Sequence, residues 1–179
     1  MSLHAFVDES IRGRRYVICA VLIPVGSLGP ARRALRHLRA PGQRRIHFAR
    51  ESDERRRAAL GSIAALDVEP IVFFADNRDQ VAARARILAA MVADLRSVGV
   101  TRVVIESRER QDDRDRSVLF EAIGHHPAPP LTYVHRRATD EPLLWIADAI
   151  AWAWGRGGTW RTRLDHLGIL PRVAEVKTC

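Results

Sequence analysis

Two apolar segments open the chain and lie only a few residues apart. They are LHAFVD at 3–8 and YVICAVLI at 16–23, and the basic stretch RGRR lies between them. Apolar runs of this length around a glycine-containing turn predict an antiparallel β-hairpin. A chain that begins with such a hairpin and then alternates strands with helices is expected to form a mixed sheet covered by helices.

Strand-like and helix-like segments do alternate along the rest of the chain, and no repeat or long linker interrupts them. We therefore expect a single α/β domain over residues 1–179, with a mixed β-sheet and helices on both faces. Further strands are predicted at 45–48, 68–75, 101–105 and 131–135, and helices at 30–40, 52–66, 79–98 and 112–123, before a last long helix.

Capping signals mark several of these boundaries. Ser52 is a predicted N-cap, followed by acids that suit a helix N-terminus. Gly99 stands where a helix commonly ends in the left-handed conformation. Asp140 is the predicted cap of the last helix, with Pro142 in its first turn.

The composition is that of a water-soluble globular protein. Hydrophobic residues make up 47% of the 179 residues and charged residues 28%. No apolar run approaches the roughly 20 residues needed to cross a bilayer, and the N-terminus does not resemble a signal peptide. The two cysteines, Cys19 and Cys179, do not form a disulfide framework, so we expect a protein of the reducing cytoplasm.

The charge of the chain is strongly positive. The formal net charge is +8, and of 29 basic residues only Lys177 is a lysine. Arginine presents a planar fork that matches phosphate, so a nucleic-acid partner is one interpretation. The alternative is that a GC-rich genome has replaced lysine by arginine throughout.

Asp148 is the most informative acid in the sequence. It interrupts the apolar run LLWIADAIAWAW, where its neighbours at helical spacing are Leu144, Trp145, Ala151 and Trp152. A buried carboxylate is costly unless it is paired, hydrogen-bonded or bound to a metal. The sequence therefore predicts either a functional carboxylate or a buried ion pair with one of the many arginines.

Other acids stand at the predicted strand ends. Asp8 and Glu9 end the first strand, where neighbouring side chains point to opposite faces, and the alternative is that they only begin a turn. Glu106 directly follows the apolar run VVI, at the strand end where α/β sheets place ligands. A solvated strand end is the competing interpretation.

Several carboxylates that meet at one place repel one another, and a divalent cation relieves the repulsion. Mg²⁺ prefers oxygen ligands and uses few protein carboxylates. Glu141, two helical turns before Asp148, is a candidate to join such a site or to complement the helix N-terminus. His47 is a candidate ligand or general base, or else a partner in local hydrogen bonds.

Three motifs in order, FVDES, IESR and EPLLWIADAIA, resemble a family of RNase H-like proteins of unknown function that are expected to be nucleases. Members of that family open with a strand reading Y-I-D-E-S-G and close with a helix carrying L-Q-x-A-D. The resemblance covers nearly the whole chain and implies an RNase H-like fold. It also implies that Asp8, Glu106 and Asp148 are the acids of the site, with Glu9 as a further family acid.

Two positions depart from the family pattern. Arg45 and Ile46 precede His47, where the family often has a glutamate, and Trp145 stands in place of the usual glutamine. A fourth ligand is therefore missing from its expected place, and Glu51 or Glu141 would have to replace it.

The sequence as a whole predicts a nuclease or phosphodiesterase that depends on Mg²⁺ or Mn²⁺, held by Asp8, Glu106 and Asp148. Arg108 and Arg116 are the predicted contacts to the phosphate backbone of a nucleic acid, although the charged stretch RERQDDRDR at 108–116 reads mainly as a solvated helix start. The rival prediction is a non-catalytic RNase H-like module that binds nucleic acid or a protein.

Overall fold

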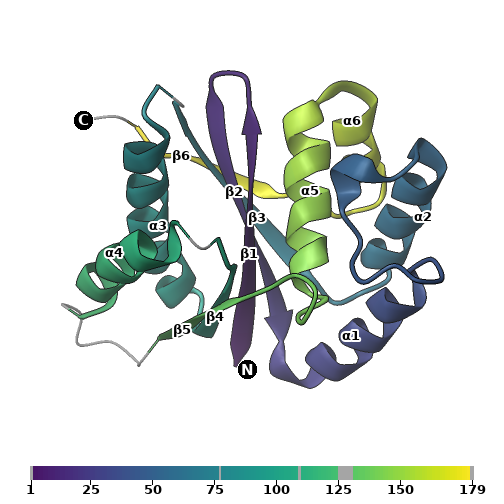
Figure 1. Cartoon of the computed structure of the whole chain (residues 1–179), viewed down its shortest axis with the longest axis horizontal. Helices are drawn as coiled ribbons and strands as arrows, with labels where there is room; N and C mark the ends of the chain where they lie inside the picture. The colour runs from purple at the N-terminus through teal and green to yellow at the C-terminus, as the bar shows by residue number, and fades with distance from the viewer. Residues whose placement is uncertain (1, 77, 109, 125–130, 178–179) are drawn as a thin grey trace.

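The computed structural model describes residues 2–76, 78–108, 110–124 and 131–177. Six strands form one mixed sheet in the order β5-β4-β1-β2-β3-β6 (Figure 1). The strands are β1 Leu3–Arg12, β2 Arg15–Pro24, β3 Glu69–Asp76, β4 Val100–Glu106, β5 Thr132–Arg136 and β6 Arg172–Glu175. The helices are α1 Leu28–His37, α2 Asp53–Ala64, α3 Gln80–Ser97, α4 Asp112–Gly124, α5 Leu144–Arg156 and α6 Gly158–His166, with 3-10 turns η1 Val25–Ser27 and η2 Phe48–Arg50.

The predicted hairpin is present and longer than expected. β1 and β2 pair antiparallel from Leu3 opposite Pro24 to Arg12 opposite Arg15. Gly13 turns the chain between them with φ +56°, a conformation that glycine adopts without a steric penalty. Strand β1 also pairs with β4 along its other edge, and these two strands run parallel. Strand β5 in turn runs parallel to β4.

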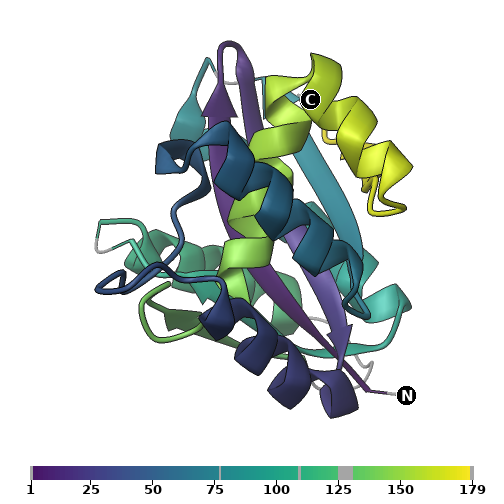
Figure 2. The same ribbon diagram turned by 90° about the vertical axis from the view of Figure 1, so that its right-hand side faces the viewer.

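Helices cover both faces of the sheet (Figures 1 and 2). Alternate residues of β1 point to opposite faces, so Phe6 packs in one core while Ala5 and Val7 pack in the other. The Phe6 core also contains buried residues of α1, α2, α5 and α6, and the Val7 core those of α3 and α4. This arrangement confirms the predicted mixed sheet with helices on both faces.

Helix α5 is apolar around its whole circumference because it lies in the middle of a layer. It packs on β1 and β2 on one side and contacts α2 and α6 on the others. Ten of its thirteen residues are buried, which explains why its sequence has no polar stripe. The helix ends at Arg156, and Gly157, with φ +70°, separates it from α6.

Three predictions about elements are wrong. Residues 45–48 form no strand, because the Phe48 N–H donates to Asp148 and the His47 carbonyl accepts from Arg50. Asp140 does not cap α5, which begins at Leu144 with no side-chain cap. Helix α6 and strand β6 were not predicted at all. The Ser52 cap is confirmed by its bond from the Arg55 N–H, and no helix in the described ranges is long and apolar enough to cross a membrane.

Candidate functional site

Two parallel strands bring the first two acids together. β1 and β4 pair in register from His4 to Val7, where Val7 lies opposite Ile105, so the next residues, Asp8 and Glu106, come side by side. Both belong to the face that carries Phe6, two residues before Asp8. The pairing of the two strands thus places two acidic residues next to each other on one face of the sheet.

Helix α5 supplies the third acid from above the same face. One oxygen of Asp148, Oδ2, accepts a hydrogen bond from the Phe48 N–H at 2.9 Å. The His47 Nδ1 lies 3.8 Å from the same oxygen. Asp8, Glu106 and Asp148 line one cavity of about 300 Å³, which we call the carboxylate cavity. Its other walls include Arg45, His47, Arg108, Trp145 and Trp152.

The charges of the carboxylate cavity shift the acid equilibria. Burial raises the pKa of Asp8 well above its ordinary value, and repulsion from Glu106 and Asp148 raises it further. Burial also raises the pKa of Asp148, although the Phe48 N–H and His47 oppose that shift. The site therefore holds more negative charge than its surroundings stabilise.

Two arginines offset part of this charge. Arg45 donates to Glu106 at 2.7 Å. Arg108 lies 3.8 Å from Asp8 and 3.9 Å from Glu106, and its side chain is 42% exposed. Both arginines therefore reach the acids from the open side of the cavity.

Glu9 borders the same cavity, but its carboxylate is held mainly from the opposite face of the sheet. It accepts hydrogen bonds from Tyr16 and from Arg84, which comes from α3. Its other oxygen lies 2.6 Å from Arg108, so Arg108 links Glu9 to the acids of the cavity. The neighbouring acids Asp8 and Glu9 thus point to different faces, as their strand positions predict.

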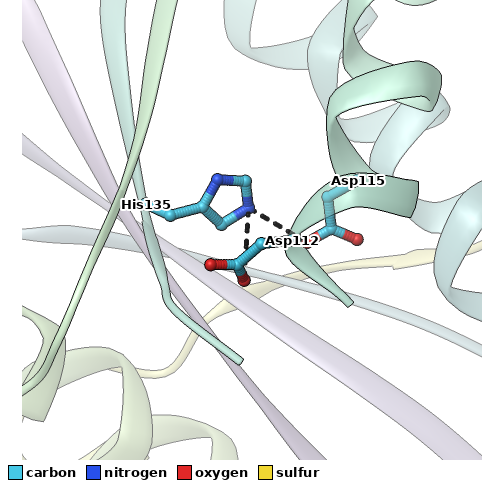
Figure 3. A group of neighbouring side chains, drawn as sticks. All are labelled: Asp112, Asp115 and His135. Carbon is cyan, nitrogen blue, oxygen red and sulfur yellow. Dashed lines mark hydrogen bonds and ion pairs between the residues drawn. The ribbon is translucent and has the colours of Figure 1, made fainter. Parts of the chain in front are cut away.

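Arg84 joins Glu9 to a second cluster, made of Asp112, Asp115 and His135 (Figure 3). Arg84 binds both oxygens of Asp115, at 2.8 and 2.7 Å, and His135 Nε2 lies 3.2 Å from Asp115. Burial by itself raises the pKa of Asp115, but the hydrogen bonds from Arg84 and His135 lower it below its ordinary value. The Asp115 carboxylate of this second cluster is therefore already paired with a cation of the protein.

The sequence analysis did not group these residues. Asp115 lies in the stretch expected to be a solvated helix start, yet it is only 2% exposed. The missed signal is the helical spacing of Asp112 and Asp115, which places both on one face of α4. His135 and Arg84 come from elements far away in the chain, so no local pattern joins them to the acids.

Other predicted site residues lie elsewhere. Glu141 binds Arg32 through both oxygens and accepts from the Leu143 N–H, and it does not line the carboxylate cavity. Arg116 pairs with Asp113 on the exposed side of α4. Glu51 binds Gln43 and Arg55. None of the three reaches Asp8, so the fourth ligand is not supplied by Glu51 or Glu141.

The donor set of the carboxylate cavity fits a hard divalent cation, because all three acids offer oxygens. Among the described residues, only Asp112, Asp115 and His135 bring three possible ligand atoms within 4.8 Å of one another. Asp8, Glu106 and Asp148 therefore form a wider set.

No protein-family model and no curated protein matches the sequence. Among solved structures, the chain is similar to an RNase HII chain in the structure of the PCNA:RNase HII complex from Archaeoglobus fulgidus. The TM-score is 0.58 at 18% sequence identity, and the match covers 92% of this chain and 76% of the other. An alignment of this extent, together with the mixed sheet and its hairpin, gives the chain an RNase H-like α/β fold.

Proposed function

We propose that the protein hydrolyses phosphodiester bonds in nucleic acid with a divalent cation held by Asp8, Glu106 and Asp148. The observation that supports this most is the meeting of three carboxylates, from the interior of β1, the end of β4 and helix α5, in one cavity beside two arginines. Bound Mg²⁺ or Mn²⁺ would activate a water and stabilise the leaving oxygen. The fold similarity to an RNase HII chain supports nucleic acid as the substrate class.

Each protein group has a definite part in this proposal. The Phe48 N–H fixes one oxygen of Asp148, which leaves the other free for the cation. His47 Nδ1 is buried without a hydrogen-bond partner among the described residues, so it is available to orient a water or accept its proton. Arg108, anchored by Glu9, would move from the carboxylates to a phosphate oxygen of the substrate.

The direct test is cleavage of labelled DNA duplex, RNA duplex, RNA–DNA hybrid and single strands in Mg²⁺ or Mn²⁺. We expect Asp8→Asn and Asp148→Asn each to lower the rate by about 100-fold or more, because electrostatic stabilisation of the transition state is lost. Asp165→Asn is the matched control, since Asp165 is exposed on α6. If the wild type cleaves and both site variants cleave as fast, the assigned site is wrong.

A second candidate function is a non-catalytic module that binds nucleic acid or a protein. The observation in its favour is Arg45, which lies 2.7 Å from Glu106 and takes the place that a cation would occupy. A module of this kind needs no metal, because the arginine already compensates the acid.

Substitution of Arg45 separates the two candidates. Removing one positive charge next to Glu106 strengthens cation binding by about 1.4 kcal/mol as an order of magnitude, or tenfold. We expect Arg45→Gln to bind Mn²⁺ about tenfold more tightly than the wild type, measured by calorimetric titration, with Arg44→Gln unchanged. If Mn²⁺ binds Arg45→Gln but not the wild type, the non-catalytic module is the better description.

A further inference from the structure

Nearly all of the net positive charge lies in one stretch of the chain. Residues 28–57, which we call the Arg-rich segment, contain ten arginines and three acids. Their balance is +7, out of a net charge of +8 for the whole protein. An even substitution of arginine for lysine across the chain does not explain such a concentration, because the other arginines are matched by acids.

The arginines of the Arg-rich segment fall into two groups. Four of them form ion pairs within the protein, namely Arg32 with Glu141, Arg45 with Glu106, Arg55 with Glu51 and Arg56 with Asp53. The other six are exposed, and none of them forms an ion pair with a described residue. These six, which we call the outer arginines, are Arg33, Arg36, Arg39, Arg44, Arg50 and Arg57.

The fold places the outer arginines on one side of the molecule. Helices α1 and α2 contact each other, and Figure 2 shows them together with the connecting loop on the side facing the viewer. The buried residues of α1 are Leu28, Ala31 and Leu35, so Arg33 and Arg36 point away from the core. The connecting loop also supplies Arg45, His47 and Ala49 to the carboxylate cavity, so the basic surface continues into that cavity.

The chemistry of this surface indicates its partner. Arginine binds phosphate through a planar fork of donors, and a row of unpaired arginines matches a regular polyanion. Proteins that bind single strands add exposed aromatic rings on which bases stack. Phe48 is the only Phe, Tyr or Trp of the Arg-rich segment, and it is 0% exposed. The surface is therefore suited to the phosphate backbone of a double-stranded nucleic acid, in which the bases are already paired.

We propose that the outer arginines of α1, the connecting loop and α2 bind the backbone of a double-stranded nucleic acid, independently of its sequence, and lead it to the carboxylate cavity. This deepens the proposed function and rests on it for the role of the cavity. Phosphate contacts position a duplex without reading its bases, so the surface sets the placement of the substrate and contributes no sequence preference.

The test compares two variants that remove equal charge. The first carries Arg33→Gln, Arg36→Gln, Arg50→Gln and Arg57→Gln. The control carries Arg14→Gln, Arg78→Gln, Arg114→Gln and Arg172→Gln, all exposed arginines outside the segment. Binding of a labelled 20-base-pair duplex and of its single strand is measured by fluorescence anisotropy in EDTA, over a range of salt concentrations. Circular dichroism checks that both variants stay folded.

We expect the first variant to bind duplex about 100-fold more weakly than the wild type, and the control to bind within a few-fold of it. The slope of log affinity against log salt should fall in magnitude by about 3.6 in the first variant, since it loses four phosphate contacts and each removes about 0.9. Equal losses in the two variants would overturn the proposal. So would tighter wild-type binding of the single strand than of the duplex, or no binding of either.

Because duplex binding is measured without metal, a failure of the basic surface to bind can be distinguished from a failure of the protein to hydrolyse nucleic acid. A wild type that binds duplex through the outer arginines but never cleaves in Mn²⁺ refutes hydrolysis alone. A wild type that cleaves, with both quadruple variants binding alike, refutes the basic surface alone.

Discussion

Three carboxylates lie close together in the carboxylate cavity, and the protein itself compensates them only in part. Asp8 is 8% exposed and lies next to Glu106, while Arg45 pairs with Glu106 and Arg108 lies within 4 Å of both acids. The pKa of Asp8 lies well above its ordinary value because of burial and of repulsion from Glu106 and Asp148. A group in this state destabilises the metal-free fold when it ionises.

Replacing Asp8 by asparagine removes that destabilisation. A folded-state pKa above the unfolded one means that stability is fully present below the ordinary pKa of an aspartate and is lost as pH rises through the raised value. In EDTA we expect Asp8→Asn to be more stable than the wild type at pH 8, by more than about 1 kcal/mol, because the pKa of Asp8 lies well above its ordinary value. At pH 4 the two should differ little.

Urea unfolding at pH 4, 6 and 8 measures the difference, with Asp165→Asn as the exposed control. A wild type that gains stability over Asp8→Asn as pH rises would show that Asp8 is a well-compensated ion pair and not a strained metal ligand.

At the residue scale, the sequence predicted much of the site. The apolar neighbours of Asp148 at helical spacing predicted its place on the inner side of α5, where its side chain is 21% exposed. Glu106 ends β4 as predicted, whereas Asp8 lies inside β1, which continues to Arg12 because its pairing with β2 extends that far. The Phe48 N–H that orients Asp148 comes from a loop 100 residues earlier, and no local pattern links the two. Glu141 was predicted to share a helix face with Asp148, but α5 begins only at Leu144, so helical spacing does not apply to Glu141.

At the scale of elements, one buried ion network joins β1 to α3 and α4. Arg84 of α3 is 6% exposed and binds Glu9 of β1 and Asp115 of α4. Its position beneath the first site strand indicates that it supports Glu9, which in turn holds Arg108. We regard Arg84 as a residue that stabilises the fold below the site.

Arg84→Leu removes the buried cation that Glu9 and Asp115 share, and leaves Glu9 with Arg108 and Asp115 with His135. We expect a loss of about 3–5 kcal/mol in the free energy of unfolding, as is common when one partner of a buried pair is removed. Arg116→Leu, which breaks the exposed pair with Asp113 on α4, should change stability by about 0.5 kcal/mol or less. Chemical denaturation near pH 7 compares the two variants, and similar small effects would mean that the network contributes no net stability.

The elements themselves were predicted unevenly, for physical reasons. The hairpin, β3, β4 and α3 carry long apolar patterns and are present close to the expected residues. Residues 45–48 read as a strand because RIHF alternates polar and apolar residues, but its backbone bonds go to Asp148 and to a 3-10 turn. β6 has mostly exposed residues, and it becomes a strand only because β3 offers a free edge to pair with.

At the scale of the whole molecule, β1, the end of β4 and helix α5 together line the carboxylate cavity, to which the Arg-rich segment contributes Arg45, His47 and Ala49. Figure 2 shows α1, the connecting loop and α2 on one side of the molecule. The RNase H-like fold was predicted from the ordered motifs and is confirmed. The single domain over 1–179, the cytoplasmic location and the detailed family resemblance stay predictions. The sequence shows that positive charge is concentrated in residues 28–57. Only the three-dimensional structure shows that this segment lies beside the cavity.

The central claim is that Asp8, Glu106 and Asp148 together bind a divalent cation, and calorimetric titration with Mn²⁺ tests it most directly. We predict that the wild type and Asp165→Asn bind Mn²⁺ with the same affinity, and that Asp8→Asn and Asp148→Asn each bind it at least about tenfold more weakly, a loss of about 1.4 kcal/mol or more. Equal Mn²⁺ affinity in all four proteins, or no binding by the wild type, would contradict the claim.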